Sequence, residues 1–300
     1  MDIKYISLGF SCMSRGYGSL VSPDPRALPY DWNITTKEFV LRSLTNLDGG
    51  EFTPAVDELS VYEMPDTNQG PYKDGIFFWH DFSREGPFLV PNWREEINYL
   101  QKYPFLWERF LKLIKDDAVR KVFIISNAQS NIDQYSSSKR DYSEKFQIDS
   151  LYLEMLKQKL DLAGVKNYEF LILFGVIDEF LDVIRTSKLD CIDPRFVGAH
   201  WGLNNTIANS LIKREFPMPN AGRIVGMYDN SGHQAEIQLA PHNTFVILNS
   251  EKKVWGAAKS YADGYLFSLL RGDSKEADIF TAAEYNGTIF FSNNYNWHKV

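Results

Sequence analysis

The sequence has few cysteines and no long apolar run, and each absence excludes a class of protein. Its 300 residues include only two cysteines, Cys12 and Cys191, whereas small secreted domains depend on several disulfides. No stretch of about 18 apolar residues occurs, so we expect no membrane span. The segment after Met1 lacks a basic region followed by an apolar one, so we expect no signal peptide. The simplest expectation is a cytoplasmic location, where both thiols stay reduced.

Basic residues are outnumbered, and the usual metal and phosphate motifs are missing. The 32 Lys and Arg residues against 39 Asp and Glu residues give a net charge of -7, which argues against nucleic acid as a partner. The sequence contains no His-Glu-x-x-His, no Cys-x-x-Cys and no glycine-rich phosphate loop. We therefore expect neither a metal nor another cofactor. The oligomeric state stays open.

Apolar residues make up 44% of the chain and aromatic residues 15%, enough for a substantial core. Strand-like apolar runs alternate with amphipathic helical patterns, while residues 47–75 carry many turn formers and predict irregular structure. The runs lie at residues 3–8, 122–126, 170–174 and 196–197, and helical patterns lie at residues 146–163, 177–184 and 205–213. This alternation predicts a three-layer α/β domain with a mainly parallel sheet, of the Rossmann-like or SGNH-like kind.

After about residue 220 the pattern changes to short strands separated by Gly, Asn and Asp turns. We therefore predict a catalytic α/β domain over residues 1–220 and a β-rich module or extension over residues 221–300. This tail is rich in aromatic residues, which either fill a small β core or stack on sugar rings. They are Tyr228, Trp255, Tyr261, Tyr265, Tyr285, Tyr295 and Trp297.

Cys12 is the sharpest candidate for chemistry, because it follows the first predicted strand and precedes a predicted helix. Functional groups of parallel sheets gather at the carboxyl ends of the strands. Backbone N–H groups at a helix N-terminus lower the pKa of a thiol, and the thiolate is the nucleophilic form. The alternative is a small buried residue that closes a contact between helix and strand.

Three segments resemble the motifs of a bacterial family described as papain-like cysteine peptidases. They are Ile6-Ser7-Leu8-Gly9-Phe10-Ser11-Cys12, then Pro29-Tyr30-Asp31-Trp32, then Trp79-His80-Asp81-Phe82. The resemblance covers the first third of the chain well and the middle weakly, and the β-rich tail lies outside it. It implies Cys12 as the nucleophile and His80 as its base.

A second resemblance is to the SGNH (GDSL-type) hydrolases. Gly9-Phe10-Ser11 is similar to their first block, Ile125-Ser126-Asn127 to their Asn block, and His200-Trp201 to their His block. It implies Ser11 as the nucleophile, Asn127 as an oxyanion donor and His200 as the base of an esterase that acts on acylated carbohydrate. Phe10 replaces their Asp, and Asp193 lies too far from His200 for their Asp-x-x-His spacing.

The first resemblance and the strand-end rule together favour a cysteine-dependent hydrolase or acyl-transfer enzyme, and the serine esterase is the alternative. In the favoured function Cys12 attacks a carbonyl of a peptide, acyl or glycan substrate, and His80, or else His200, takes the proton. Either Asp31 or Asp81 orients the histidine. Backbone N–H groups after Gly9, together with Asn127, Trp32 and Trp201, are the candidate substrate contacts. A third hypothesis is a non-catalytic glycan-binding or scaffold protein.

Overall fold

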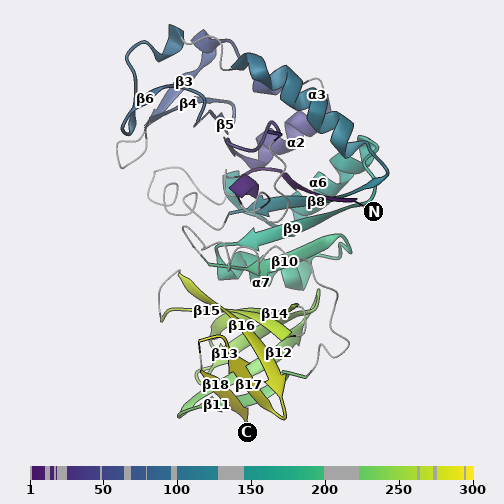
Figure 1. Cartoon of the computed structure of the whole chain (residues 1–300), viewed down its shortest axis with the longest axis vertical. Coiled ribbons are helices and arrows are strands. Elements are labelled where there is room, and N and C mark those ends of the chain that lie inside the picture. Colours follow the sequence, from purple (N-terminus) through teal and green to yellow (C-terminus); the bar gives the residue numbers. More distant parts are fainter. Residues whose placement is uncertain are drawn as a thin grey trace. The chain divides into compact units, whose positions relative to one another are not determined.

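The computed structural model describes most of the chain, and Figure 1 draws it as a ribbon. The described residues are 2–10, 14–16, 18, 26–47, 49–63, 69–78, 80–95, 100–127, 145–198, 223–261, 264–272, 276–293 and 295–300. By their internal contacts they form two compact units, Met1–Phe170 and Leu171–Val300. The predicted helix at residues 205–213 lies outside the described residues.

A four-stranded parallel sheet contains strands at the first three predicted apolar runs, and its fourth strand overlaps the run at residues 196–197 only at Phe196. Its order is β1-β8-β9-β10, and the strands are β1 (Asp2–Ser7), β8 (Val119–Ser126), β9 (Tyr168–Phe174) and β10 (Ile192–Phe196). The last six residues of β8 are all buried, as expected for a parallel strand covered on both faces. The prediction of a mixed α/β protein with a parallel sheet is therefore confirmed.

The main helices begin and end where local sequence signals favour it. They are α2 (Lys37–Asn46), α3 (Tyr103–Ile114), α6 (Ser150–Leu162) and α7 (Ile177–Thr186). Asp149 caps α6 by accepting a 2.7 Å hydrogen bond from the Tyr152 N–H. Pro104 lies in the first turn of α3, and Gly164 follows α6 with a positive φ of 77°.

The segment predicted to be irregular contains ordered structure, so that prediction is wrong. Its strands β3 (Ser60–Glu63) and β4 (Gln69–Lys73) pair with each other, and a small antiparallel sheet of order β2-β5-β4-β3 includes them. The other short elements described between residues 34 and 102, most of them outside that segment, are β2 (Ile34–Thr35), β5 (Ile76–Phe77), β6 (Arg84–Glu85), β7 (Phe88–Leu89), η1 (Gly50–Phe52), η2 (Val56–Glu58), η3 (Trp93–Glu95) and η4 (Leu100–Lys102).

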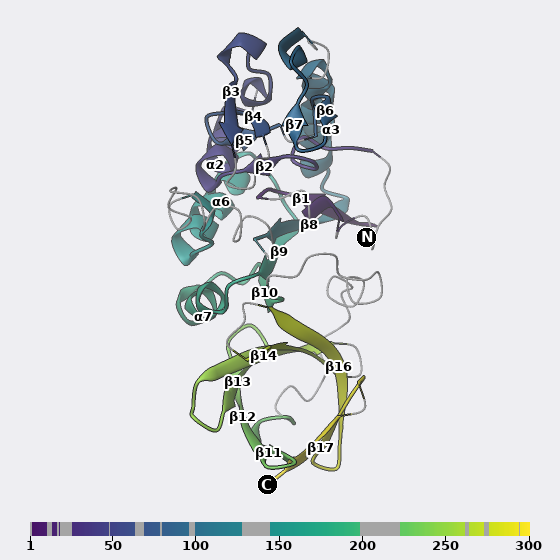
Figure 2. The ribbon, with the colours of Figure 1, turned by 90° about the vertical axis from the view of Figure 1, so that its left-hand side faces the viewer.

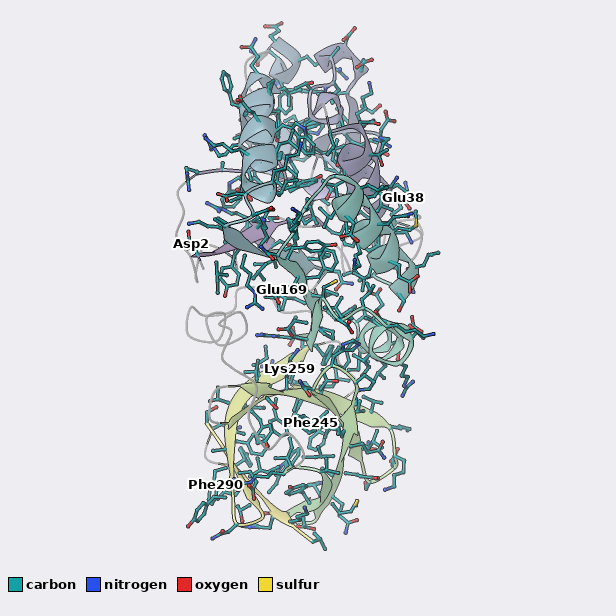
Figure 3. All side chains as sticks on the ribbon, turned by 90° about the vertical axis from the view of Figure 1, so that its right-hand side faces the viewer. Asp2, Glu38, Glu169, Phe245, Lys259 and Phe290 are labelled. Atoms are coloured by element: carbon teal, nitrogen blue, oxygen red, sulfur yellow. The ribbon has the colours of Figure 1, made fainter. Side chains whose placement is uncertain are left out.

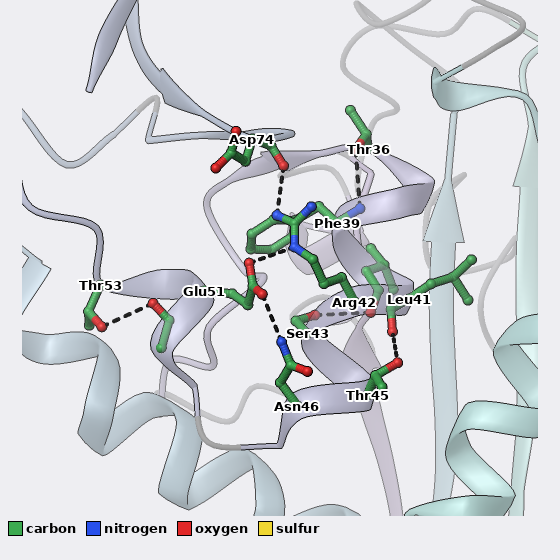
Figure 4. A network of polar contacts seen from close by, with 12 residues as sticks. Thr36, Phe39, Leu41, Arg42, Ser43, Thr45, Asn46, Glu51, Thr53 and Asp74 are labelled. Carbon is green, nitrogen blue, oxygen red and sulfur yellow. Dashed lines mark hydrogen bonds and ion pairs between the residues drawn. The ribbon is translucent and has the colours of Figure 1, made fainter. Parts of the chain in front are cut away.

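Arg42 shows how such a polar segment is held in place (Figure 4). Its Nε donates a 2.7 Å hydrogen bond to Glu51 of η1, and its Nη2 donates one of 2.9 Å to the carbonyl of Asp74. Asn46 reaches the other oxygen of Glu51 at 2.9 Å. Side chains of α2 therefore hold two loops that apolar periodicity alone does not specify.

The C-terminal tail forms a closed antiparallel barrel of eight consecutive strands, with the first paired to the last (Figure 2). The strands are β11 (Gly226–Asn230), β12 (His233–Ala240), β13 (Thr244–Asn249), β14 (Val254–Tyr261), β15 (Gly264–Leu270), β16 (Ala277–Tyr285), β17 (Thr288–Phe291) and β18 (Asn296–Lys299). The β-rich tail is thus confirmed, although the sequence pattern did not predict β14, β16, β18 or the closure.

Side chains alternate between the interior and the outside of this barrel, as its strand geometry requires. Phe245 on β13 is fully buried in the barrel core, whereas Phe290 on β17 is 45% exposed; Figure 3 labels both. Of the tail aromatics, Tyr228, Tyr265 and Trp297 belong to the core, and Trp255 packs against it. The prediction that the tail aromatics fill a small β core is therefore confirmed for some of them.

One buried charge cluster connects the barrel to β10 within the second unit. Lys259 of β14 bonds Asp193 of β10, and Arg195 bonds the same carboxylate at 3.0 Å. Burial alone would raise the pKa of Asp193, but the charges of Arg195 and Lys259 lower it well below its usual range. The carboxylate therefore stays ionised and paired.

Candidate functional site

The ends of β1 and β8 lie next to each other at one edge of the parallel sheet. Ser7 is in register with Ile124, and the Leu8 N–H donates a 3.0 Å hydrogen bond to the Ile124 carbonyl. Gly9 and Asn127, which follow these strands, are consequently brought to the same edge. Both are buried, with Asn127 fully inaccessible to solvent. This is the edge at which parallel sheets carry their functional groups.

Gly9 takes a conformation that other residues rarely adopt. Its φ is +74°, and a Cβ built on it would lie 2.4 Å from Oγ1 of Thr35. The next residue, Phe10, forms a bridge with Thr35, whose N–H donates a 3.0 Å hydrogen bond to the Phe10 carbonyl. The backbone that leads into Ser11 and Cys12 is therefore fixed against β2.

A helical segment begins shortly after this point. Residues 14–16 and 18 are helical, and Ser14 Oγ donates a 2.8 Å hydrogen bond back to the Gly9 carbonyl. Ser11 and Cys12 themselves lie outside the described residues. The described flanks nonetheless have the strand, glycine turn and helix order that the sequence predicts around Cys12.

Asp31 lies buried in a turn that contacts this helical segment. Its Oδ2 accepts a 2.7 Å hydrogen bond from the Leu28 N–H and lies 3.4 Å from Nε of Arg15. The side chain is fully inaccessible to solvent. The carboxylate thus closes its own turn and joins it to the residues that follow Cys12.

Trp32 and His80 lie next to each other, although 47 positions separate them in the sequence. Their ring centroids are 5.9 Å apart in an edge-to-face arrangement. Trp32 is 48% exposed, and the His80 side chain also reaches solvent. Partial burial of the ring lowers the pKa of His80, with Arg84 and Lys102 adding to the effect and Asp81 opposing it. At neutral pH the imidazole is therefore mostly uncharged and able to accept a proton.

Asp81 is buried, and its hydrogen bonds do not go to His80. Tyr103 donates a 2.6 Å hydrogen bond to its Oδ2, and Lys102 bonds its Oδ1. Tyr103 in turn accepts a 2.7 Å hydrogen bond from Asn33. Burial and the Asp81 charge raise the pKa of Tyr103 well above its usual value, so the phenol keeps its proton and donates it.

This network connects the Asp31-Trp32 motif to the His80-Asp81 motif. It also includes residues that the sequence analysis did not identify. Asn33 follows Asp31-Trp32, and its partner Tyr103 binds Asp81. Nothing in the local pattern singled out Lys102, Tyr103 or Asn33 as site residues. The one usable signal was Pro104, because a first-turn proline marks the start of a helix and so places Lys102 and Tyr103 at its N-terminal end.

The other predicted site residues have different outcomes. His200 and Trp201 lie outside the described residues, so their predicted roles stay predictions. Within the described part of the chain, no group of three or more His, Cys, Asp and Glu side chains is arranged to hold a metal ion. Among the helices that the structure describes, none combines the length and apolar character needed to cross a membrane.

Comparison of the chain with protein-family models, with curated proteins and with solved structures found no match.

Proposed function

We propose that the N-terminal unit is a cysteine-dependent hydrolase or acyl-transfer enzyme with Cys12 as its nucleophile. One observation carries the proposal: contacts link the three sequence motifs in series. Nε of Arg15, three residues after Cys12, lies 3.4 Å from Oδ2 of Asp31. The ring of the adjacent Trp32 packs on the ring of His80, with the ring centroids 5.9 Å apart. These two contacts connect three motifs that lie far apart in the sequence, and this supports a shared site.

The proposed reaction uses each group for a step that its chemistry supports. His80 takes the thiol proton, and the Cys12 sulfur attacks the substrate carbonyl to form a tetrahedral oxyanion. Backbone N–H groups after Gly9, with Asn127, stabilise that oxyanion. His80 returns the proton to the leaving group as the carbon–leaving group bond breaks. Water, or another acceptor in a transfer reaction, then attacks the thioester and releases Cys12.

Asp31 and Asp81 act as positioning residues in this proposal. Asp31 holds the Trp32 turn against Arg15, and Asp81 holds the His80 turn through Tyr103 and Lys102. Trp32, with nearly half of its surface exposed beside His80, supplies an apolar wall for the substrate. The sequence predicts that a carboxylate orients the histidine. In this proposal the packing of His80 on Trp32 orients the ring instead.

The resemblance to papain-like cysteine peptidases agrees with these roles and remains part of the proposal. Three further predictions also remain proposals. They are the peptide, acyl or glycan nature of the substrate, the cytoplasmic location, and the Rossmann-like or SGNH-like three-layer arrangement of the sheet. The competing proposal is a serine esterase that uses Ser11, Asn127 and His200. It shares the buried Asn127 at the strand edge with the cysteine mechanism, and the two differ in the attacking atom.

A competition between the two thiols of the same chain tests the proposal. The full-length protein is treated with iodoacetamide at pH 6, and alkylation of Cys12 and Cys191 is followed by peptide mass spectrometry. The Cys191 side chain is partly exposed, and it serves as the internal reference. We expect Cys12 to react at least tenfold faster, because a thiolate at a helix N-terminus persists below the usual thiol pKa.

Matched variants separate the two nucleophiles. His80→Asn should slow the alkylation of Cys12 while leaving that of Cys191 unchanged, and Ser11→Ala should have little effect on either thiol. Equal reactivity of Cys12 and Cys191 at pH 6 would count against the cysteine mechanism. Hydrolysis of p-nitrophenyl acetate that survives Cys12→Ala and is lost in Ser11→Ala would favour the esterase.

A further inference from the structure

A second candidate site lies on the barrel, remote in sequence from Cys12. A pocket of about 170 Å³ opens between the strands β14 to β18 and is lined by aromatic, aliphatic and polar side chains. The aromatic ones are Trp255, Phe280, Phe291, Tyr295 and Trp297, and the polar ones are Asp278 and Asn293. Three of these aromatic side chains reach solvent, since Trp255 and Phe280 are partly exposed and Tyr295 is 59% exposed.

The rings of this barrel pocket are held rigidly. Trp255 and Trp297 stack with centroids 5.5 Å apart and planes 21° from parallel. Trp297 also packs edge-to-face on Phe291 at 4.9 Å. The Trp255 indole N–H donates a 3.1 Å hydrogen bond to the Leu270 carbonyl. Rings fixed before a ligand arrives lose little conformational entropy on binding.

Polar groups border the same rings. Asp278 Oδ1 accepts a 2.7 Å hydrogen bond from Nε of Arg271, whereas its Oδ2 has no hydrogen bond to the residues that the structure describes. The side-chain oxygen of Asn293 accepts a 3.3 Å hydrogen bond from the Tyr295 N–H, which leaves its amide NH₂ to face a ligand. The pocket thus combines flat apolar faces with a hydrogen-bond acceptor and a donor at its edge.

We propose that this pocket binds a sugar ring of a neutral glycan. A pyranose has one face of C–H groups, which packs on an aromatic ring, and a perimeter of hydroxyls, which need both donors and acceptors. An aromatic cage for an ammonium group is the main alternative. Asp278, the carboxylate that lines the pocket, is already paired with the guanidinium of Arg271, which weakens its attraction for a cationic ligand. The site does not depend on the Cys12 mechanism.

Titration of the full-length protein with three neutral hexasaccharides tests the proposal. Maltohexaose, cellohexaose and chitohexaose are added separately, and tryptophan fluorescence and heat release are recorded. We expect at least one to bind and to change the emission of the stacked tryptophans. Tyr295→Ala should weaken that binding at least tenfold, and Tyr295→Phe should retain most of it. Tyr295 is largely exposed, so neither change threatens the fold.

Tyr285→Ala is the matched control, because Tyr285 is 69% exposed at the opposite end of β16 from Asp278, about 23 Å along the strand. It should leave the affinity unchanged. The proposal is overturned if none of the three glycans binds, if Tyr285→Ala and Tyr295→Ala weaken binding equally, or if tetramethylammonium binds in their place. Alkylation of Cys12 is unaffected by any of these outcomes, so the two proposals fail separately.

Discussion

The region up to Asn127 and the C-terminal barrel bury different kinds of side chain. The first region buries four polar side chains of the candidate site almost completely from solvent. They are Asp31, Asn33, Asp81 and Asn127. In the described barrel strands, the buried polar side chains other than tyrosine are the hydroxyls Thr244 and Ser268. Burying charged and amide groups requires specific partners, so the first region depends on individual hydrogen bonds and the barrel on apolar packing.

The largest effect should come from opening the barrel core. Phe245→Ala should lower the free energy of unfolding by about 3–5 kcal/mol, because it removes a fully buried ring and leaves a cavity. Urea denaturation monitored by circular dichroism measures this. The control is Phe290→Ala, on the outside of the barrel, which should change stability by less than about 0.5 kcal/mol. Similar losses in both variants would contradict the assigned interior.

A buried charge pair gives the next largest effect. Lys259→Met should destabilise the second unit by about 2 kcal/mol at pH 7, since the buried Asp193 loses the cationic partner that Lys259 provides. The pKa of Asp193 is lowered in the folded state, so its stabilising contribution is present at neutral pH and is lost as the pH falls below about 4. The difference from wild type should therefore shrink in acid. A difference that grows in acid would contradict the pairing.

The polar network near His80 should be less costly to break. Asp81→Ala should lower the free energy of unfolding by about 1.5 kcal/mol, because the buried Tyr103 hydroxyl loses its acceptor while Lys102 is free to hydrate. Asp81→Asn keeps an acceptor for Tyr103 and should cost less. If Asp81→Asn is the more damaging change in urea denaturation, the hydrogen bond to Tyr103 is not the stabilising contact.

The smallest effect on stability and the clearest effect on reactivity are expected at His80. His80→Asn should change stability by less than about 0.5 kcal/mol, because the ring reaches solvent and makes no hydrogen bond to a described residue. In the wild type, Cys12 reactivity should rise with pH through a value below 6.5, since the pKa of His80 is lowered and only the neutral ring accepts the proton. The measurement is the rate of Cys12 alkylation as a function of pH. In His80→Asn the rise of that rate below pH 6.5 should disappear if His80 takes the thiol proton.

The sequence predicted the regular parts of the fold better than the polar parts. Apolar runs located β1, β8 and β9, because strands buried on both faces are recognisable from composition alone. It did not predict β14, whose Gly256, Ala257 and Ala258 lack the large apolar side chains of a typical strand. Barrel closure depends on pairing between β11 and β18, which no local pattern encodes.

For the candidate site, the sequence predicted the motifs but not their supports. Asp31-Trp32 and His80-Asp81 stood out by residue type, and the structure brings Trp32 and His80 into contact. The partners of Asp81 come from the start of α3, which the sequence separates from it by more than twenty residues. Hydrogen bonds across such distances follow from the folded packing, so residue spacing could not identify them.

The most direct test of the central claim is the distance from Sγ of Cys12 to the ring nitrogens of His80 in a crystal structure of the reduced protein. The account predicts about 3–4 Å for a direct hydrogen bond, or about 5 Å with one bridging water. A separation beyond about 8 Å, with His80 facing away from the turn after Gly9, would contradict it.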